Sequence, residues 1–105
     1  MPWLDFIAWF FGGAFLANAI PHFVAGITGR KFPTAVAKPP GVGLSSPPTN
    51  VIYGVVNLAL AYLLLVQVGS FDFQDIIHVV VAGLGFALMG VMVASYFAGR
   101  FPDHA

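Results

Sequence analysis

Three long apolar segments, separated by more polar connections, dominate the pattern of this chain. They run from Trp3 to Ile27, from Asn50 to Gly69 and from Ile76 to Gly99. Each has about the 20 residues that an α-helix needs to cross a bilayer, and none has the polar stripe of a helix on a soluble protein. The alternation typical of membrane β-barrels is missing. The pattern predicts an all-α, polytopic integral membrane protein with transmembrane helices at about 3–27, 50–69 and 76–99, in one domain spanning 1–105.

Composition strengthens this prediction. The 105 residues are 59% hydrophobic and 8% charged, whereas soluble domains carry about 25% charged residues. The formal net charge of zero argues against a nucleic-acid partner. Because the chain contains no cysteine, it has neither disulfides nor thiolate metal sites. We expect the lipid bilayer to be its main surroundings and no metal ion to be bound.

The charged residues are divided unequally between the connections. All basic side chains belong to the first connection (28–49) and the C-terminal tail: Arg30, Lys31, Lys38 and Arg100. The second connection contains Asp72 and Asp75 and no base. Three spans put the first connection and the C-terminus on one side, so the positive-inside rule predicts that both are cytoplasmic in a cell inner (plasma) membrane, with the N-terminus outside. The bases of the first connection are candidates for contact with anionic lipid.

Aromatic residues stand near the predicted helix ends, as in the aromatic belts of membrane proteins. Trp3 and Trp9 are expected toward the outer interface. Tyr96, Phe97 and Phe101 are expected at the inner end of the third helix.

The segment "KPPGVGLSSPP" at 38–48 has the glycines and lysine of a phosphate-binding loop in the wrong order. A Walker-type loop places its lysine after the glycines, whereas Lys38 precedes Gly41 and Gly43. A dinucleotide fingerprint follows a strand, but a predicted transmembrane helix precedes this segment. The prolines hold the chain extended, and Ser45 or Ser46 can cap the second helix. We therefore predict an ordered, Pro/Gly-rich cytoplasmic connector that binds no nucleotide.

Polar residues inside a membrane are costly, so their positions are informative. Four are predicted at one depth in the inner half of the bilayer: Asn18, His22, Asn57 and Ser95. Pro21 is expected to kink the first helix, because it leaves the carbonyl of Ala17 without its usual N–H donor. This cluster either holds the bundle together by hydrogen bonds or forms a small-solute or proton site beside a broken helix. The first interpretation is favoured, since the bilayer core holds no acidic residue of the kind that proton pathways usually carry.

The two histidines of the predicted spans are expected near opposite surfaces. His78 opens the third helix at the outer surface, and His22 lies roughly 20 Å away along the bilayer normal by the helical rise. They cannot hold one haem within a protomer, because both imidazoles would have to reach the same iron. A lone interfacial histidine is typically solvated. We expect no cofactor, and no haem at either residue.

The third span carries small residues at near-helical spacing: Gly83, Ala87, Gly90, Ala94 and Ala98. They fall within an arc of about 80° at 100° per residue. Such flat faces let helix backbones approach closely. Gly13 and Ala17 offer a shorter version on the first span. Two such faces on three helices predict that one of them serves a neighbouring protein.

No motif identifies a known family, and no acid–base pair, metal cluster or activated nucleophile predicts an enzyme. The leading hypothesis is a small non-enzymatic inner-membrane protein that acts through helix packing, as a homo-oligomer or as an accessory subunit of a larger membrane complex. The alternative is a minimal small-solute or proton-linked transporter or channel with a polar site at Asn18, His22 and Asn57. Expected partners are the bilayer and other membrane subunits or a second copy, with no nucleic acid and no nucleotide.

Overall fold

The computed structural model describes residues 2–100 and contains three long helices, α1 (Pro2–Ile27), α2 (Pro47–Val66) and α3 (Ile76–Phe97). All three are long and apolar enough to cross a membrane. The prediction of an all-α chain with three helices of membrane-spanning length is thereby confirmed. α2 begins and ends three residues earlier than predicted, at Pro47 and Val66. The predicted belt residue Phe101 lies outside the described residues.

Both later helices begin at a capping side chain. The Ser46 hydroxyl accepts a hydrogen bond from the Thr49 N–H at 3.3 Å, and prolines fill the first turn of α2, where no N–H is needed. This confirms the predicted serine cap. At α3, Asp75 Oδ1 accepts from the Ile77 N–H at 3.0 Å. α1 continues through Pro21 without interruption.

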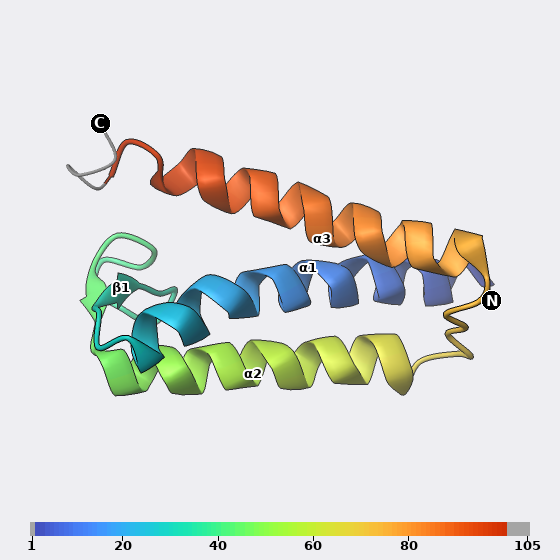
Figure 1. Ribbon diagram of the computed structural model, residues 1–105, viewed down its shortest axis with the longest axis horizontal. Coiled ribbons are helices and arrows are strands. Elements are labelled where there is room, and N and C mark those ends of the chain that lie inside the picture. The colour runs from blue at the N-terminus through green and yellow to red at the C-terminus, as the bar shows by residue number, and fades with distance from the viewer. Residues whose placement is uncertain (1, 101–105) are drawn as a thin grey trace.

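α1 is the central helix of the bundle. It packs against both α2 and α3, whereas α2 and α3 barely touch each other (Figure 1). Backbone contacts at glycines make this close approach possible. A methyl group on Gly13 would overlap the carbonyl oxygen of Ala82, and one on Gly85 would overlap that of Phe10. In lipid, helix association depends largely on van der Waals contact, so small residues are expected where two helices meet.

The connection between α1 and α2 folds into an ordered cap over one end of the bundle. It contains a two-stranded antiparallel pair, β1 (Phe32–Pro33) and β2 (Leu44–Ser45). Beside this pair, the buried hydroxyls of Thr34 and Ser45 share a hydrogen bond of 2.7 Å. The Tyr96 hydroxyl donates to the carbonyl of Gly41 at 2.9 Å and so ties α3 to the cap. We call this end of the bundle the hairpin end, and the end at 67–75 the short-loop end.

Charges are separated between these two ends. In the described part of the chain, the bases lie at the hairpin end and are exposed: Arg30, Lys31, Lys38 and Arg100. The acidic residues Asp5, Asp72 and Asp75 lie at the short-loop end, where Asp5 adjoins Gly69. Residues 2–100 therefore have one basic and one acidic end along the axis of the helices.

Candidate functional site

Two side-chain hydrogen bonds join α1 to α2. Asn18 Nδ2 donates to Asn57 Oδ1 at 3.1 Å. One turn closer to the hairpin end, His22 Nδ1 lies 3.0 Å from Asn50 Oδ1. His22, Asn50 and Asn57 are buried, and Asn50 is 0% exposed. We call these four residues the polar seam.

Asn50 is the most connected residue of the polar seam. Its Nδ2 lies 3.1 Å from each of three carbonyl oxygens, which belong to Phe32, Ser45 and Ser46. The amide cannot be reversed, because Oδ1 would then face three other oxygens. Asn50 thus ties the first turn of α2 both to the strand pair and to α1.

A cavity of about 240 Å³ lies beside the polar seam, on the side of α1 that faces α3 and the connection. Its walls include Asn18, His22, Thr34, Tyr53, Met89 and Tyr96. Of the residues that the structure describes, no Asp, Glu, Lys or Arg lines it. Asn57 is not among its lining residues, and both ends of its amide are bonded: Nδ2 donates to the carbonyl of Tyr53 at 2.8 Å, and Oδ1 accepts from Asn18.

Three of the four predicted polar residues meet in this region. Asn18, His22 and Asn57 all belong to the polar seam. Ser95 does not: it is exposed on α3, outside the hydrogen bonds of the seam. Its depth was inferred from helical rise, which says nothing of the face on which a residue lies.

The apolar pattern predicted Asn50 only as the start of a helix and did not place it in the polar cluster. The buried residues of α2 are Asn50, Gly54, Asn57 and Ala61. Their spacing of four, three and four residues marks one helix face. That spacing is the signal that could have placed Asn50 beside Asn57. Thr34 and Ser45 had no comparable signal, since the folding of the connection buries them.

The small residues predicted as a packing face on α3 point out of the protomer. All five (Gly83, Ala87, Gly90, Ala94 and Ala98) are exposed. A methyl group added to Gly83 or Gly90 would meet nothing within 4 Å. The α1–α3 contact uses Gly85 instead, which is the one buried residue of α3. We call the five exposed residues the outer face of α3.

Two apolar grooves border this outer face. One, of about 400 Å³, is lined by residues of all three helices, including Gly13, Ala61 and Gly83. The other, of about 370 Å³, lies between α1 and α3 and includes Gly90 and Ala94. Phe86 lines both grooves, so they follow one another along α3.

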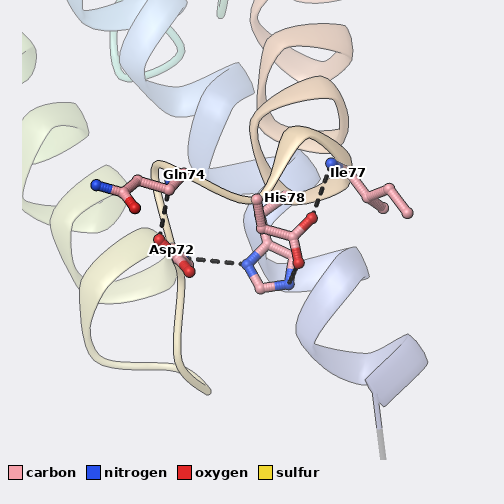
Figure 2. A network of polar contacts seen from close by, with 5 residues as sticks. Asp72, Gln74, Ile77 and His78 are labelled. Atoms are coloured by element: carbon pink, nitrogen blue, oxygen red, sulfur yellow. Dashed lines mark hydrogen bonds and ion pairs between the residues drawn. The ribbon is translucent and has the colours of Figure 1, made fainter.

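His78, at the short-loop end, is more tightly held than expected. Its Nδ1 accepts a hydrogen bond from the backbone N–H of Asp72 at 3.1 Å, and its Nε2 lies 3.4 Å from Asp75 Oδ2 (Figure 2). Its side chain is 18% exposed. The expectation of a solvated histidine was therefore wrong, because the turn before α3 folds back over the ring.

Trp9 also differs from its predicted place in an aromatic belt. It is 3% exposed, and its indole N–H donates to the carbonyl of Val68 at 2.9 Å. Its ring centroid lies 4.4 Å from that of His78. Trp3, in contrast, is 54% exposed. Trp9 therefore fastens α1 to the short-loop end.

Within residues 2–100, no three His, Cys, Asp or Glu side chains gather in a way that would hold a metal ion. Comparisons with models of protein families, with curated proteins and with solved structures give no match for this chain.

Proposed function

We propose that this is a small, non-enzymatic inner-membrane protein that acts through helix packing, as a homo-oligomer or as an accessory subunit of a larger membrane complex. The observation that carries the proposal is the outer face of α3. Its glycines at Gly83 and Gly90 have open space around them. Small residues at this spacing let another helix backbone approach closely, which maximises van der Waals contact between helices in lipid.

The contacts inside the protomer support this assignment, because they do not use the outer face. α1 and α3 already meet through Gly13 and Gly85. A partner helix lying along Gly83, Gly90 and Ala94 would fill the two grooves that border these residues. The partner is a second copy of this chain or an apolar helix of another subunit.

The polar seam has a structural role in this proposal. It holds α1 against α2 and the connection, and so fixes the frame from which α3 presents its outer face. Asn57 uses both ends of its amide within the seam. This favours packing over a transport path along Asn18, His22 and Asn57, which would need such groups to be free for a solute.

The charge distribution supports an orientation with the hairpin end in the cytoplasm. Within residues 2–100, the bases are all at that end and the acidic residues are all at the other. The positive-inside rule assigns the basic end to the cytoplasmic side. There, Arg30, Lys31 and Lys38 are exposed and able to contact anionic headgroups.

Native mass spectrometry after mild extraction from the protein's own membrane tests the proposal. A homo-oligomer appears as a multiple of 11.1 kDa, and an accessory subunit appears in a complex with other masses. A particle that contains one copy and no other protein, at every detergent concentration tried, would contradict both forms of the proposal.

A further inference from the structure

The polar seam determines which nitrogen of His22 carries the proton. Asn50 Oδ1 accepts only, and the three carbonyl oxygens around Asn50 Nδ2 fix that orientation. The 3.0 Å contact is therefore a hydrogen bond that His22 Nδ1–H donates to Asn50. A charged imidazole is costly inside a membrane, so the ring is neutral and Nε2 carries a lone pair.

Nε2 of His22 has no hydrogen-bond donor within residues 2–100. Yet none of the fully buried side-chain nitrogen and oxygen atoms in this part of the chain lacks a partner. Nε2 therefore keeps accessible surface, although His22 as a whole is 4% exposed. His22 lines the 240 Å³ cavity, so a ligand seated there lies beside the imidazole ring.

The rest of the cavity describes the ligand that would fit. Within residues 2–100, no Asp, Glu, Lys or Arg lines it, which favours a neutral molecule. Its walls include the rings of Tyr53 and Tyr96 and the thioether of Met89; both kinds of group pack well against a flat ring. Its volume is below the roughly 300–1,000 Å³ of pockets for drug-sized ligands, so it suits a single ring.

One side of the cavity leads toward the lipid. Met92, on its α3 wall, is 63% exposed on a membrane-length helix. An apolar tail that leaves the cavity past Met92 would run along this helix.

From these observations we infer that the cavity is a binding site for a neutral, tailed phenol, whose ring hydroxyl donates a hydrogen bond to His22 Nε2. The ring occupies the aromatic and thioether walls, and the tail extends into the bilayer. A hydroquinone can donate this hydrogen bond to His22 Nε2, whereas its quinone can only accept and so cannot. This site is separate from the outer face of α3 and does not depend on the proposed helix packing.

The test uses the full chain in nanodiscs and a pair of probes that differ only in the donor. The probes are 4-octylphenol and its methyl ether, titrated by calorimetry, with empty nanodiscs giving the background from partition into lipid. We expect saturable binding of the phenol and binding of the ether about tenfold weaker or worse, because the ether leaves Nε2 without its hydrogen bond. Equal affinity for both probes, or no saturable binding of the phenol, would overturn the inference.

Two substitutions in the connection provide matched variants that leave the polar seam intact. Ala35 lines the cavity and is exposed, so Ala35→Phe should fill it and abolish binding of 4-octylphenol. Val36 is its exposed neighbour and does not line the cavity, so Val36→Phe should bind as the unmodified chain does. If Ala35→Phe binds the phenol with unchanged affinity, the site is elsewhere and the inference fails.

A third variant tests the acceptor itself. His22→Phe keeps a ring but removes Nε2, so the phenol should lose its advantage over the methyl ether. Thermal unfolding is measured alongside, since the same change leaves Asn50 Oδ1 without its donor. Should His22→Phe fail to fold, the Ala35→Phe and Val36→Phe pair decides the question.

Discussion

Gly85 of α3 lies against the carbonyl oxygen of Phe10 of α1 so closely that a methyl group on Gly85 would overlap that oxygen. The same helix carries Gly90, one and a half turns away, where a methyl group meets open space. Gly85 and Gly90 thus have opposite surroundings. One is part of the contact between helices within the protomer, and the other belongs to the outer face.

This contrast predicts opposite effects of one small substitution. Gly85→Ala should lower the free energy of unfolding by about 1–3 kcal/mol, because α1 and α3 must move apart to make room. Gly90→Ala should change it by less than about 0.5 kcal/mol. Thermal or SDS-induced unfolding in detergent micelles, with both variants beside the unmodified chain, measures the difference. If both variants lose the same free energy of unfolding, α3 does not pack against α1 through Gly85.

The polar seam is expected to contribute unequally along its length. Asn50→Leu removes the partner of His22 and of three carbonyl oxygens, so we expect a loss of about 3 kcal/mol or more in the free energy of unfolding. Asn18→Leu removes a single hydrogen bond to Asn57, which in membranes is worth about 0.6–2 kcal/mol. The same unfolding assay ranks them. If Asn18→Leu is the more harmful change, Asn50 is not the centre of the seam.

The stability of the short-loop end should depend on the indole of Trp9. Trp9→Phe keeps an aromatic ring but loses the hydrogen bond to the carbonyl of Val68, so the free energy of unfolding should fall by about 1 kcal/mol. Hydrogen exchange at 67–75 should also become faster. Trp3→Phe is the control, because Trp3 is exposed and should tolerate the change. If hydrogen exchange at 67–75 is unchanged in the Trp9 variant, Trp9 does not hold the short-loop end against α1.

The helices were predictable from the chain alone, because uninterrupted apolar segments of this length have few other structures open to them. The serine cap of α2 followed from its position before two prolines. The register in which α3 packs against α1 could not be predicted from the sequence. In a soluble helix a polar side marks the outside, but here every side is apolar, and nothing local distinguishes Gly85 from Gly83 or Gly90.

The polar residues were only partly predictable for a related reason. Asn18 and Asn57 could be matched by depth, because both lie on long helices with a known rise. The role of Asn50 depends on carbonyl oxygens of Phe32 and Ser45, which reach it only after the connection has folded. Trp9 was expected at the surface because tryptophan is typical there, and the fold of 67–75 covers it.

Orientation can be tested with single cysteines, since the chain contains none of its own. Ala35 lies in the connection at the hairpin end and Ser70 at the short-loop end, and both are exposed. In intact cells, an impermeant maleimide should label Ser70→Cys, whereas Ala35→Cys should react only after the membrane is opened. Labelling of Ala35→Cys from outside would reverse the orientation we propose.

The central claim is that the outer face of α3 binds another helix, and the stoichiometry of Gly90→Leu tests it most directly. The matched control is Ser95→Leu, which adds a similar side chain at an exposed position of α3 outside that face. Native mass spectrometry of nanodisc-embedded protein, purified with any co-extracted subunits, gives the copy number and partners of each variant. We expect Gly90→Leu to lose the second copy or partner while Ser95→Leu retains it, because only the first change holds two backbones apart. A Gly90→Leu protein with the same copy number and partners as the unmodified chain would contradict the account.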